Sequence, residues 1–167
     1  MIITIFIAKL CEKLLRLFGR GATTFPGKIA LLLKKDILLY LSRGVKTVIV
    51  TGTNGKTTTA KMIEQGLKQA GKSCFLNRSG ANLITGITAS FLSNCDFKGR
   101  CHYEYAVIEC DENALKKVSL CIHAEILVVT NIFRDQLDRY GEVTSTLAAI
   151  RQGAQNMKNA MLVLNAD

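Results

Sequence analysis

A glycine turn followed by a lysine and three threonines has the residue types and the spacing needed to bind phosphate. It comes directly after the β-branched run 48–50, and its residues are Gly52, Thr53, Asn54, Gly55, Lys56, Thr57 and Thr58. Glycines let a loop bend until successive backbone N–H groups point at one anion, and a helix that begins at the lysine adds its positive end. The pattern predicts a phosphate-binding loop, in which Lys56 reaches the terminal phosphates and the Thr57 hydroxyl is a ligand of Mg²⁺.

This loop is shorter than the general phosphate-loop pattern. The general pattern has a glycine five positions before Gly55, where this chain has Val50. A simpler interpretation is a glycine turn that only joins a strand to a helix. The lysine, the hydroxyls and the preceding apolar strand all agree with phosphate binding, and we favour that interpretation.

A carboxylate ends one of the later apolar runs. Glu109 stands at the end of this run, where a magnesium ion on a bound nucleotide needs an oxygen ligand. We therefore predict Thr57 and Glu109 as metal ligands, and Lys56 and Glu109 as catalytic residues. Asp111 and Glu112 follow closely, and at least one of them is expected to cap the next helix.

Two further polar loops follow predicted strands. Residues 77–82 could present N–H groups and amides to an anionic or amide-rich substrate, although such a loop is by itself an ordinary strand-to-helix connection. Residues 130–141 crowd charged groups at the end of another strand. The candidates in this second loop are Asn131, Asp135, Asp138 and Arg139. The two aspartates are candidate metal or water-orienting groups, and the arginine is a candidate anion clamp or ion-pair partner.

Strand-like runs alternate with helical stretches from residue 46 onward. This alternation is typical of an α/β fold, a parallel sheet with helices on both faces. The predicted strands are residues 48–50, 74–76, 105–108, 126–129 and 161–164. Ligands of such sheets bind beyond the carboxyl ends of the strands. Because each polar motif follows a predicted strand, we expect the motifs to converge at one edge of the sheet.

Residues 1–45 are predicted to form a helical segment in front of the α/β domain, which covers 46–167. The apolar residues of the first helix recur at helical spacing: Ile3, Ile7, Leu10, Leu14, Leu17 and Phe18. The opposite face carries Lys9, Glu12, Lys13, Arg16 and Arg20. Charges from residue 9 onward exclude a membrane span. The helix could lie on a membrane surface, but we favour packing on its own domain with the basic face in solvent, a common pattern in globular proteins.

Two shorter helices are expected after the first one. Pro26 suits the first turn of one helix, and Asp36 is a candidate cap for the other. The formal net charge of the chain is +9, and residues 1–48 carry nine basic and two acidic residues, or +7 of it. A basic segment suits nucleic acid, an anionic membrane or a phosphorylated ligand. The chain lacks the aromatic–basic interleaving and the fold signatures of nucleic-acid binding, so nucleic acid is not expected as a partner.

The six cysteines are scattered and show no metal-binding spacing. This usage indicates free thiols in a reducing cytosol, and the chain is expected to be cytoplasmic. Cys95 and Cys101 flank a predicted loop and could pair with each other, although nothing in the sequence requires it.

Together, these motifs resemble the ATP-binding central domain of the Mur ligase family. Residues 51–58 are similar to that family's shorter phosphate loop, and the other motifs follow in the family's order. The resemblance implies ATP and Mg²⁺ as cofactors and implies that Gly80 and Asn82 contact the substrate. The last residues, 165–167, resemble the start of a segment inside that domain. The chain is therefore expected to be the N-terminal part of a larger protein, with its central domain truncated.

Within the family, the chain is most similar to the branch that amidates lipid II. The amino-acid ligases have Asp-His where this chain has Asp135-Gln136, and they use a lysine near the position of Arg151, a role that arginine cannot take. The resemblance implies that ATP phosphorylates the α-carboxylate of D-glutamate in the lipid II stem peptide and that ammonia then gives D-isoglutamine. It also implies a GatD-like glutaminase partner, contact with the inner face of the membrane, and a zinc ribbon located after Asp167.

Two other functions are compatible with the sequence. An amino-acid ligase of the Mur or folylpolyglutamate type would join an amino acid to its substrate without a glutaminase. A P-loop nucleotide-binding module without ligase activity would hydrolyse ATP slowly, unstimulated by muropeptide or ammonia. The isolated 167-residue chain is expected to be inactive, because it lacks the domain that closes over ATP.

Overall fold

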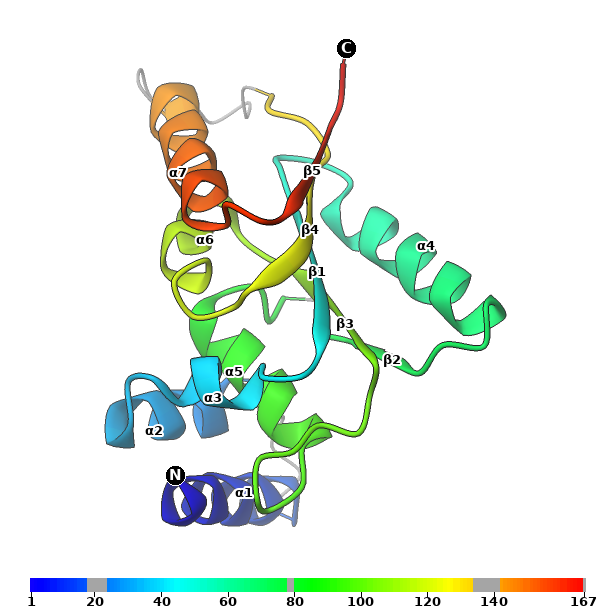
Figure 1. The fold of residues 1–167 in the computed structure, drawn as a ribbon. Coiled ribbons are helices and arrows are strands. Elements are labelled where there is room, and N and C mark those ends of the chain that lie inside the picture. The colour runs from blue at the N-terminus through cyan, green and yellow to red at the C-terminus, as the bar shows by residue number, and fades with distance from the viewer. Residues whose placement is uncertain (18–23, 78–79, 134–141, 167) are drawn as a thin grey trace.

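Five parallel strands form one sheet in the order β2-β3-β1-β4-β5 (Figure 1). The computed structural model describes residues 1–17, 24–77, 80–133 and 142–166. The strands are β1 (Lys46–Thr51), β2 (Cys74–Leu76), β3 (Tyr105–Glu109), β4 (Ala124–Val129) and β5 (Met161–Leu164). The predicted parallel sheet and all five of its strands are confirmed.

Seven helices in the described part of the chain accompany the sheet. They are α1 (Ile2–Leu17), α2 (Phe25–Leu33), α3 (Ile37–Leu41), α4 (Lys56–Gln69), α5 (Ile84–Asn94), α6 (Glu112–Val118) and α7 (Glu142–Asn156). Helix α4 covers one face of the sheet, and α5, α6 and α7 cover the other (Figure 1). Because both faces are covered, the central strands read as continuous apolar runs rather than alternating ones.

Alternate residues of each central strand enter two different apolar cores. Ile49 and Ile108 belong to the larger core, on the side of α5 to α7, whereas Val50 and Val107 pack with Ala60 under α4. The register places Ile49 opposite Ile108, so side chains of the same face align across neighbouring strands. The carboxyl ends of β1, β3 and β4 therefore meet at the same edge, where α4 begins.

The three N-terminal helices share the larger core with the α/β part. Ile5, Ile37 and Leu38 are fully buried in the cluster that also contains Phe91 and Ile108. The proposed division between residues 45 and 46 stays a prediction; among the described residues, the larger core contains side chains from both sides of it. Pro26 lies in the first turn of α2, as expected.

Asp36 precedes α3 but does not cap it. Its side chain makes no capping hydrogen bond and instead lies 3.6 Å from the Lys34 ammonium. The prediction that the Asp36 side chain caps this helix is therefore wrong. Its carboxylate faces the Lys34 ammonium and not the first N–H groups of α3.

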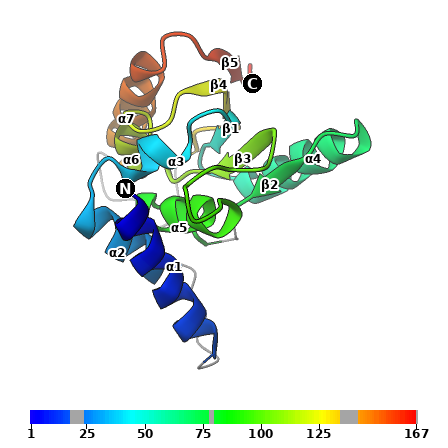
Figure 2. The same ribbon diagram turned by 60° about the horizontal axis from the view of Figure 1, so that its bottom comes forward.

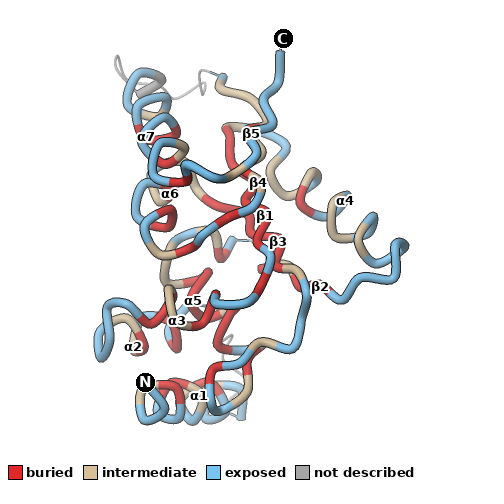
Figure 3. Tube along the Cα trace, viewed as in Figure 1, coloured by how far each residue is buried: buried red, intermediate tan, exposed pale blue. Residues whose placement is uncertain are grey.

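Helix α1 packs on the rest of the domain (Figure 2), which is the arrangement that we favoured from the sequence. The face that it buries is not the predicted apolar one. Ile5, Ala8 and Glu12 are its buried residues, whereas the predicted apolar face is exposed (Figure 3). Phe18 and Arg20, also part of that prediction, lie outside the described residues. Among the helices that the structure describes, none is both long enough and apolar enough to cross a membrane.

Candidate nucleotide-binding site

The glycines of the loop between β1 and α4 allow a conformation that other residues would not tolerate. Gly52 and Gly55 have φ angles of 125° and 81°, in the region that favours glycine. A Cβ atom on Gly52 would lie 2.3 Å from Thr130 Oγ1, so the turn presses against the chain after β4. Gly55 has open space where a side chain would be and is the N-cap residue of α4.

The first turn of α4 is available to an anion. Gly55 has no side chain to cap the helix, so no side-chain hydrogen bond occupies the first N–H groups of α4. These N–H groups and the positive end of the helix dipole form a ready anion site. Lys56 and Thr57 are the first two residues of the helix and share this end of it.

Residues after β4 hold the loop in place. The Asn131 side chain accepts a hydrogen bond from Asn54 N at 2.9 Å and donates one to Asn54 O at 3.1 Å. Thr130 Oγ1 donates to the same carbonyl at 2.7 Å, and Thr53 N donates to Asn131 O at 2.9 Å. The predicted residue Asn131 thus touches the loop itself, and its contacts position that loop.

The Lys56 ammonium is turned back onto its own loop. Its Nζ atom donates to Gly52 O at 2.5 Å and to Thr53 O at 3.1 Å, and lies 3.0 Å from Glu112 Oε1. Only 15% of the Lys56 side chain and 13% of the Glu112 side chain are exposed. The ion pair was not predicted, because its partners lie far apart in the sequence and meet only through the sheet.

Thr57 and Glu109, the two predicted metal ligands, are in direct contact, and their role as ligands stays a prediction. The Thr57 hydroxyl donates a hydrogen bond of 2.8 Å to Glu109 Oε2, and Glu109 is 5% exposed at the end of β3. A hydroxyl and a carboxylate are the hard oxygen donors that suit Mg²⁺, which usually takes one or two carboxylates and completes its shell with phosphates and water. The described residues contain no cluster of three or more His, Cys, Asp or Glu side chains suited to a metal. Thr57 and Glu109 together offer two oxygen donors, which fits a magnesium ion that takes its other ligands from a nucleotide and water.

Asn77 holds the Glu109 backbone, a role that sequence reasoning missed. Its Oδ1 accepts from Glu109 N at 2.7 Å, and its Nδ2 donates to Glu109 O and Ala81 O, both at 2.9 Å. Asn77 is 2% exposed and follows β2 directly, so the signal was an amide in the first position after a strand. It ties the end of β2 to the end of β3 beside it.

Cys110 and Asp111, the two residues after Glu109, have structural roles. Asp111 caps α6 by accepting hydrogen bonds from Asn113 N at 2.9 Å and Ala114 N at 3.2 Å, which confirms the expected cap. Cys110 is fully buried, and burial raises the pKa of its thiol. A buried neutral thiol is a poor nucleophile, so Cys110 packs rather than reacts.

The predicted substrate loop reaches the same edge of the sheet. Gly80 has a φ angle of 79° and is exposed, and the carbonyl of Asn82 accepts a hydrogen bond of 3.0 Å from Asp111 N. This bond fastens the loop after β2 to the loop after β3. Asp135, Asp138 and Arg139 lie outside the described residues, and their predicted roles stay predictions.

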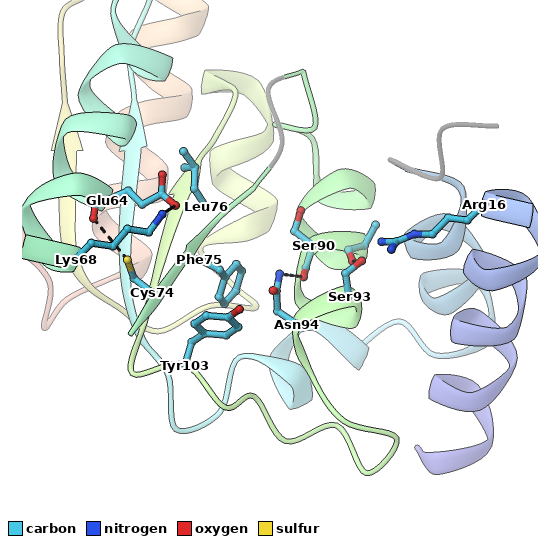
Figure 4. Close-up of a pocket in the computed structure, with 11 residues that line it drawn as sticks. Arg16, Glu64, Lys68, Cys74, Phe75, Leu76, Ser90, Ser93, Asn94 and Tyr103 are labelled. Carbon is cyan, nitrogen blue, oxygen red and sulfur yellow. Dashed lines mark hydrogen bonds and ion pairs between the residues drawn. The ribbon is translucent and has the colours of Figure 1, made fainter. Parts of the chain in front are cut away.

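A second hollow lies away from the loop, between α4, β2 and α5 (Figure 4). Its volume is about 520 Å³, and its charged groups are already paired: Lys68 with Glu64 at 2.7 Å and Arg16 with Glu12. The hydrogen bond that Lys68 donates to the Glu64 carboxylate raises the pKa of Lys68. This hollow lacks the glycine turn and the unpaired helix start that a triphosphate needs.

The fold and the loop define the class of protein: an α/β domain with a P-loop-like turn between β1 and α4. The family model of the Mur ligase middle domain matches residues 50–167, and the chain therefore belongs to the Mur ligase family. The resemblance inferred from the sequence is confirmed.

Curated relatives support one branch of that family. The chain is 43% identical over 150 residues to the MurT subunit of lipid II isoglutaminyl synthase from Streptococcus pneumoniae, covering 89% of this chain and 33% of that protein. It is 38% identical over 164 residues to MurT from Staphylococcus aureus (strain COL), covering 98% of this chain and 36% of that protein. The chain thus spans about a third of the length of these relatives.

Solved structures support the fold. MurF from Thermotoga maritima, in complex with ADP, gives a TM-score of 0.66 at 20% identity over 88% of this chain and 33% of that one. MurF from Acinetobacter baumannii gives 0.63 at 17% identity over 81% of this chain and 34% of that one.

Proposed function

We propose that the chain carries the ATP-binding part of an ATP-dependent carbon–nitrogen ligase that amidates the D-glutamate of lipid II to D-isoglutamine during peptidoglycan synthesis. The observation that carries the proposal is the convergence of Lys56, Thr57 and Glu109 at the carboxyl ends of β1 and β3. The similarity to two MurT subunits supports the substrate class.

Each residue of the loop has a distinct task in this proposal. The backbone N–H groups at the start of α4, residues 55–58, bind the triphosphate, and the Lys56 ammonium stabilises the charge that spreads over the transferred phosphoryl group. Thr57 and Glu109 would hold Mg²⁺, which would reduce the repulsion between the triphosphate and the substrate carboxylate. Gly80 and Asn82 contact the stem peptide.

The reaction proceeds through an acyl phosphate on the α-carboxylate. The phosphoryl group leaves ATP for a carboxylate oxygen, and ammonia then attacks the carbonyl carbon and releases phosphate. A GatD-like glutaminase partner supplies the ammonia. The proposed enzyme works in the cytoplasm at the inner face of the membrane.

An amino-acid ligase is the competing function. The chain is also 31% identical over 134 residues to UDP-N-acetylmuramate–L-alanine ligase from Wolbachia pipientis. Two residues argue against this function: Gln136 replaces the histidine of the amino-acid ligases, and Arg151 stands near the position of their lysine. Arginine keeps its charge and cannot form a carbamate, so it cannot substitute for that lysine.

The test uses the full-length protein with its glutaminase. We expect Lys56→Ala to lower ADP release and D-isoglutamine formation by about 100-fold or more, because a charge-stabilising donor is lost. Lys61→Ala, an exposed lysine on the same helix, is the matched control and should behave as wild type. Circular dichroism checks that both variants are folded.

Three outcomes would contradict the proposal. Undiminished turnover by Lys56→Ala would refute the phosphate role of the loop. Ligation of a free amino acid without glutaminase would identify an amino-acid ligase. ATP hydrolysis that neither muropeptide nor ammonia stimulates would identify a nucleotide-binding module without ligase activity.

A further inference from the structure

Helix α1 carries its apolar residues on the side that faces away from the protein. We call this side the outer face of α1; it consists of Ile2, Ile3, Phe6, Ile7, Leu10, Leu14 and Leu17. These side chains are between 42% and 79% exposed. A helix that only packs on its own domain buries its apolar stripe, so α1 has the reverse of the ordinary arrangement.

The polar contacts of α1 are on its inner side. Glu12 is 7% exposed, accepts a hydrogen bond of 2.7 Å from Ser93 Oγ, and pairs with Arg16. Glu12 is the only carboxylate in the helix. Since it is turned toward α5, the outer face carries no negative charge.

Basic side chains border the outer face. Lys13 is exposed, and the Lys9 ammonium lies 5.6 Å from the centre of the Phe97 ring. Phe97, 59% exposed in the loop after α5, also lies next to Phe6, with ring centres 6.1 Å apart, and extends the apolar surface. The face thus combines exposed aliphatic and aromatic groups with a cationic border.

We propose that the outer face of α1 docks on an anionic lipid bilayer. Interfacial helices lie in the membrane plane with Leu, Ile and Phe among the acyl chains and Lys and Arg at the headgroups, which is the distribution seen here. The net charge of +7 in residues 1–48 complements a negatively charged surface. The exposed apolar stripe provides the contact area that charge alone would lack.

Docking through α1 would hold the protein on the bilayer surface and keep its nucleotide-binding loop out of the bilayer. Helix α1 lies at the end of the sheet opposite the start of α4 (Figure 1). Docking therefore leaves the loop and α4 facing the aqueous side. The inference deepens the proposed function, because it explains how the enzyme stays near a lipid-linked substrate, but binding to a bilayer requires neither ATP nor that substrate.

The test is sedimentation of the 167-residue chain with vesicles, in the absence of nucleotide and substrate. We expect binding to vesicles of phosphatidylglycerol mixed with phosphatidylcholine, weaker binding to pure phosphatidylcholine, and release at high salt. The double variant Ile3→Gln/Leu10→Gln should reduce the partition coefficient by about tenfold or more. Its control is Met62→Gln/Leu120→Gln, two exposed apolar residues elsewhere on the molecule.

A charge variant tests the basic border separately. Lys13→Glu should weaken binding to the anionic vesicles several-fold, whereas Lys61→Glu, an exposed lysine on α4, should have a smaller effect. Thermal unfolding checks the fold of all variants, which replace exposed side chains.

Three results would overturn the inference. They are no binding of the wild type to anionic vesicles, wild-type binding by Ile3→Gln/Leu10→Gln, and a dimer in solution that this double variant abolishes. The last result would assign the face to a second copy of the chain. Failure here leaves the ATP-dependent test of Lys56→Ala unaffected, so the two proposals fail separately.

Discussion

The Lys56 ammonium is paired with the Glu112 carboxylate at 3.0 Å, and both side chains are mostly buried. A triphosphate in the loop needs the same ammonium, because lysine neutralises the terminal phosphates of a bound nucleotide. Nucleotide binding therefore exchanges one anionic partner of Lys56 for another. The carboxylate that is displaced remains close to the phosphates and opposes them.

Glu112→Gln should strengthen ATP binding. The substitution removes a negative charge near the phosphates, and we expect the dissociation constant to fall about threefold to tenfold. Without nucleotide, loss of the carboxylate should lower the free energy of unfolding by about 3–5 kcal/mol, because it leaves the mostly buried Lys56 ammonium without its anionic partner. Titration calorimetry and thermal unfolding measure the two effects. The control is Glu64→Gln, which breaks the Lys68–Glu64 ion pair on α4, the helix that begins with Lys56; this variant should bind ATP as the wild type does. Weaker ATP binding by Glu112→Gln would contradict the prediction and show that the Glu112 carboxylate assists the nucleotide.

Cys101 is expected to be the most reactive thiol of the described residues. Cys95 and Cys101 are antiparallel bridge partners with free thiols. The hydrogen bond from Cys95 lowers the pKa of Cys101 to about 7, against an ordinary value of 9.0, whereas the pKa of Cys95 is raised by the same contact. The Cys101 thiolate therefore forms at a lower pH than that of an ordinary thiol.

Iodoacetamide should label Cys101 first, with a rate that rises through pH about 7, because the thiolate is the nucleophile. Cys95→Ala should move this midpoint upward, toward that of an ordinary thiol, since the donor of the hydrogen bond is lost. Mass spectrometry of labelled peptides over a pH series measures both. If the pH midpoint of Cys101 labelling is unchanged in Cys95→Ala, the hydrogen bond with Cys95 is not the cause of the lowered Cys101 pKa.

At the scale of elements, the phosphate loop depends on β4 as much as on its own sequence. Gly52 lies against Thr130 and Asn131, and the Asn131 side chain makes two hydrogen bonds to Asn54. The ends of β1 and β4 are neighbours in the sheet, which is why the loop after one strand can hold the loop after the other.

Gly52→Ala should abolish nucleotide binding while leaving most of the secondary structure intact. Its Cβ atom would lie 2.3 Å from Thr130 Oγ1 and 2.7 Å from Asn131 O, so the turn must move away from β4. Gly66→Ala is the matched control: this position in α4 has open space around a Cβ atom. In the control, alanine should raise stability by about 0.5–1 kcal/mol. ATP binding by Gly52→Ala at wild-type affinity would contradict the geometry of the loop.

At the scale of the whole molecule, one apolar core joins the N-terminal helices to the sheet. Leu38 of α3 is fully buried in the cluster that contains Ile49 and Phe91. A chain whose two parts share a core is expected to unfold in a single transition. The segment 1–45 therefore contributes to stability and is more than an appendage.

Leu38→Ala should lower the free energy of unfolding by about 2–5 kcal/mol, because it leaves a cavity in this core. Denaturation followed by far-UV and near-UV circular dichroism should give coincident curves for the wild type. Leu120→Ala, at a position 66% exposed, is the control and should change stability by less than about 0.5 kcal/mol. Two separate transitions in the wild type would instead favour independent units that divide near residue 45.

Residue patterns alone were enough to predict the five strands, their parallel arrangement, the glycine loop and the placing of Thr57 and Glu109 at one edge of the sheet. These features follow from residue patterns within one element and from the rule that parallel strands end at a common edge. Three features became visible only in the folded chain: Glu112 contacts Lys56, Asn77 holds Glu109, and Ile5, Ala8 and Glu12 form the buried face of α1. Such contacts depend on strand order and helix orientation, which bring together groups far apart along the chain, and no local periodicity records them.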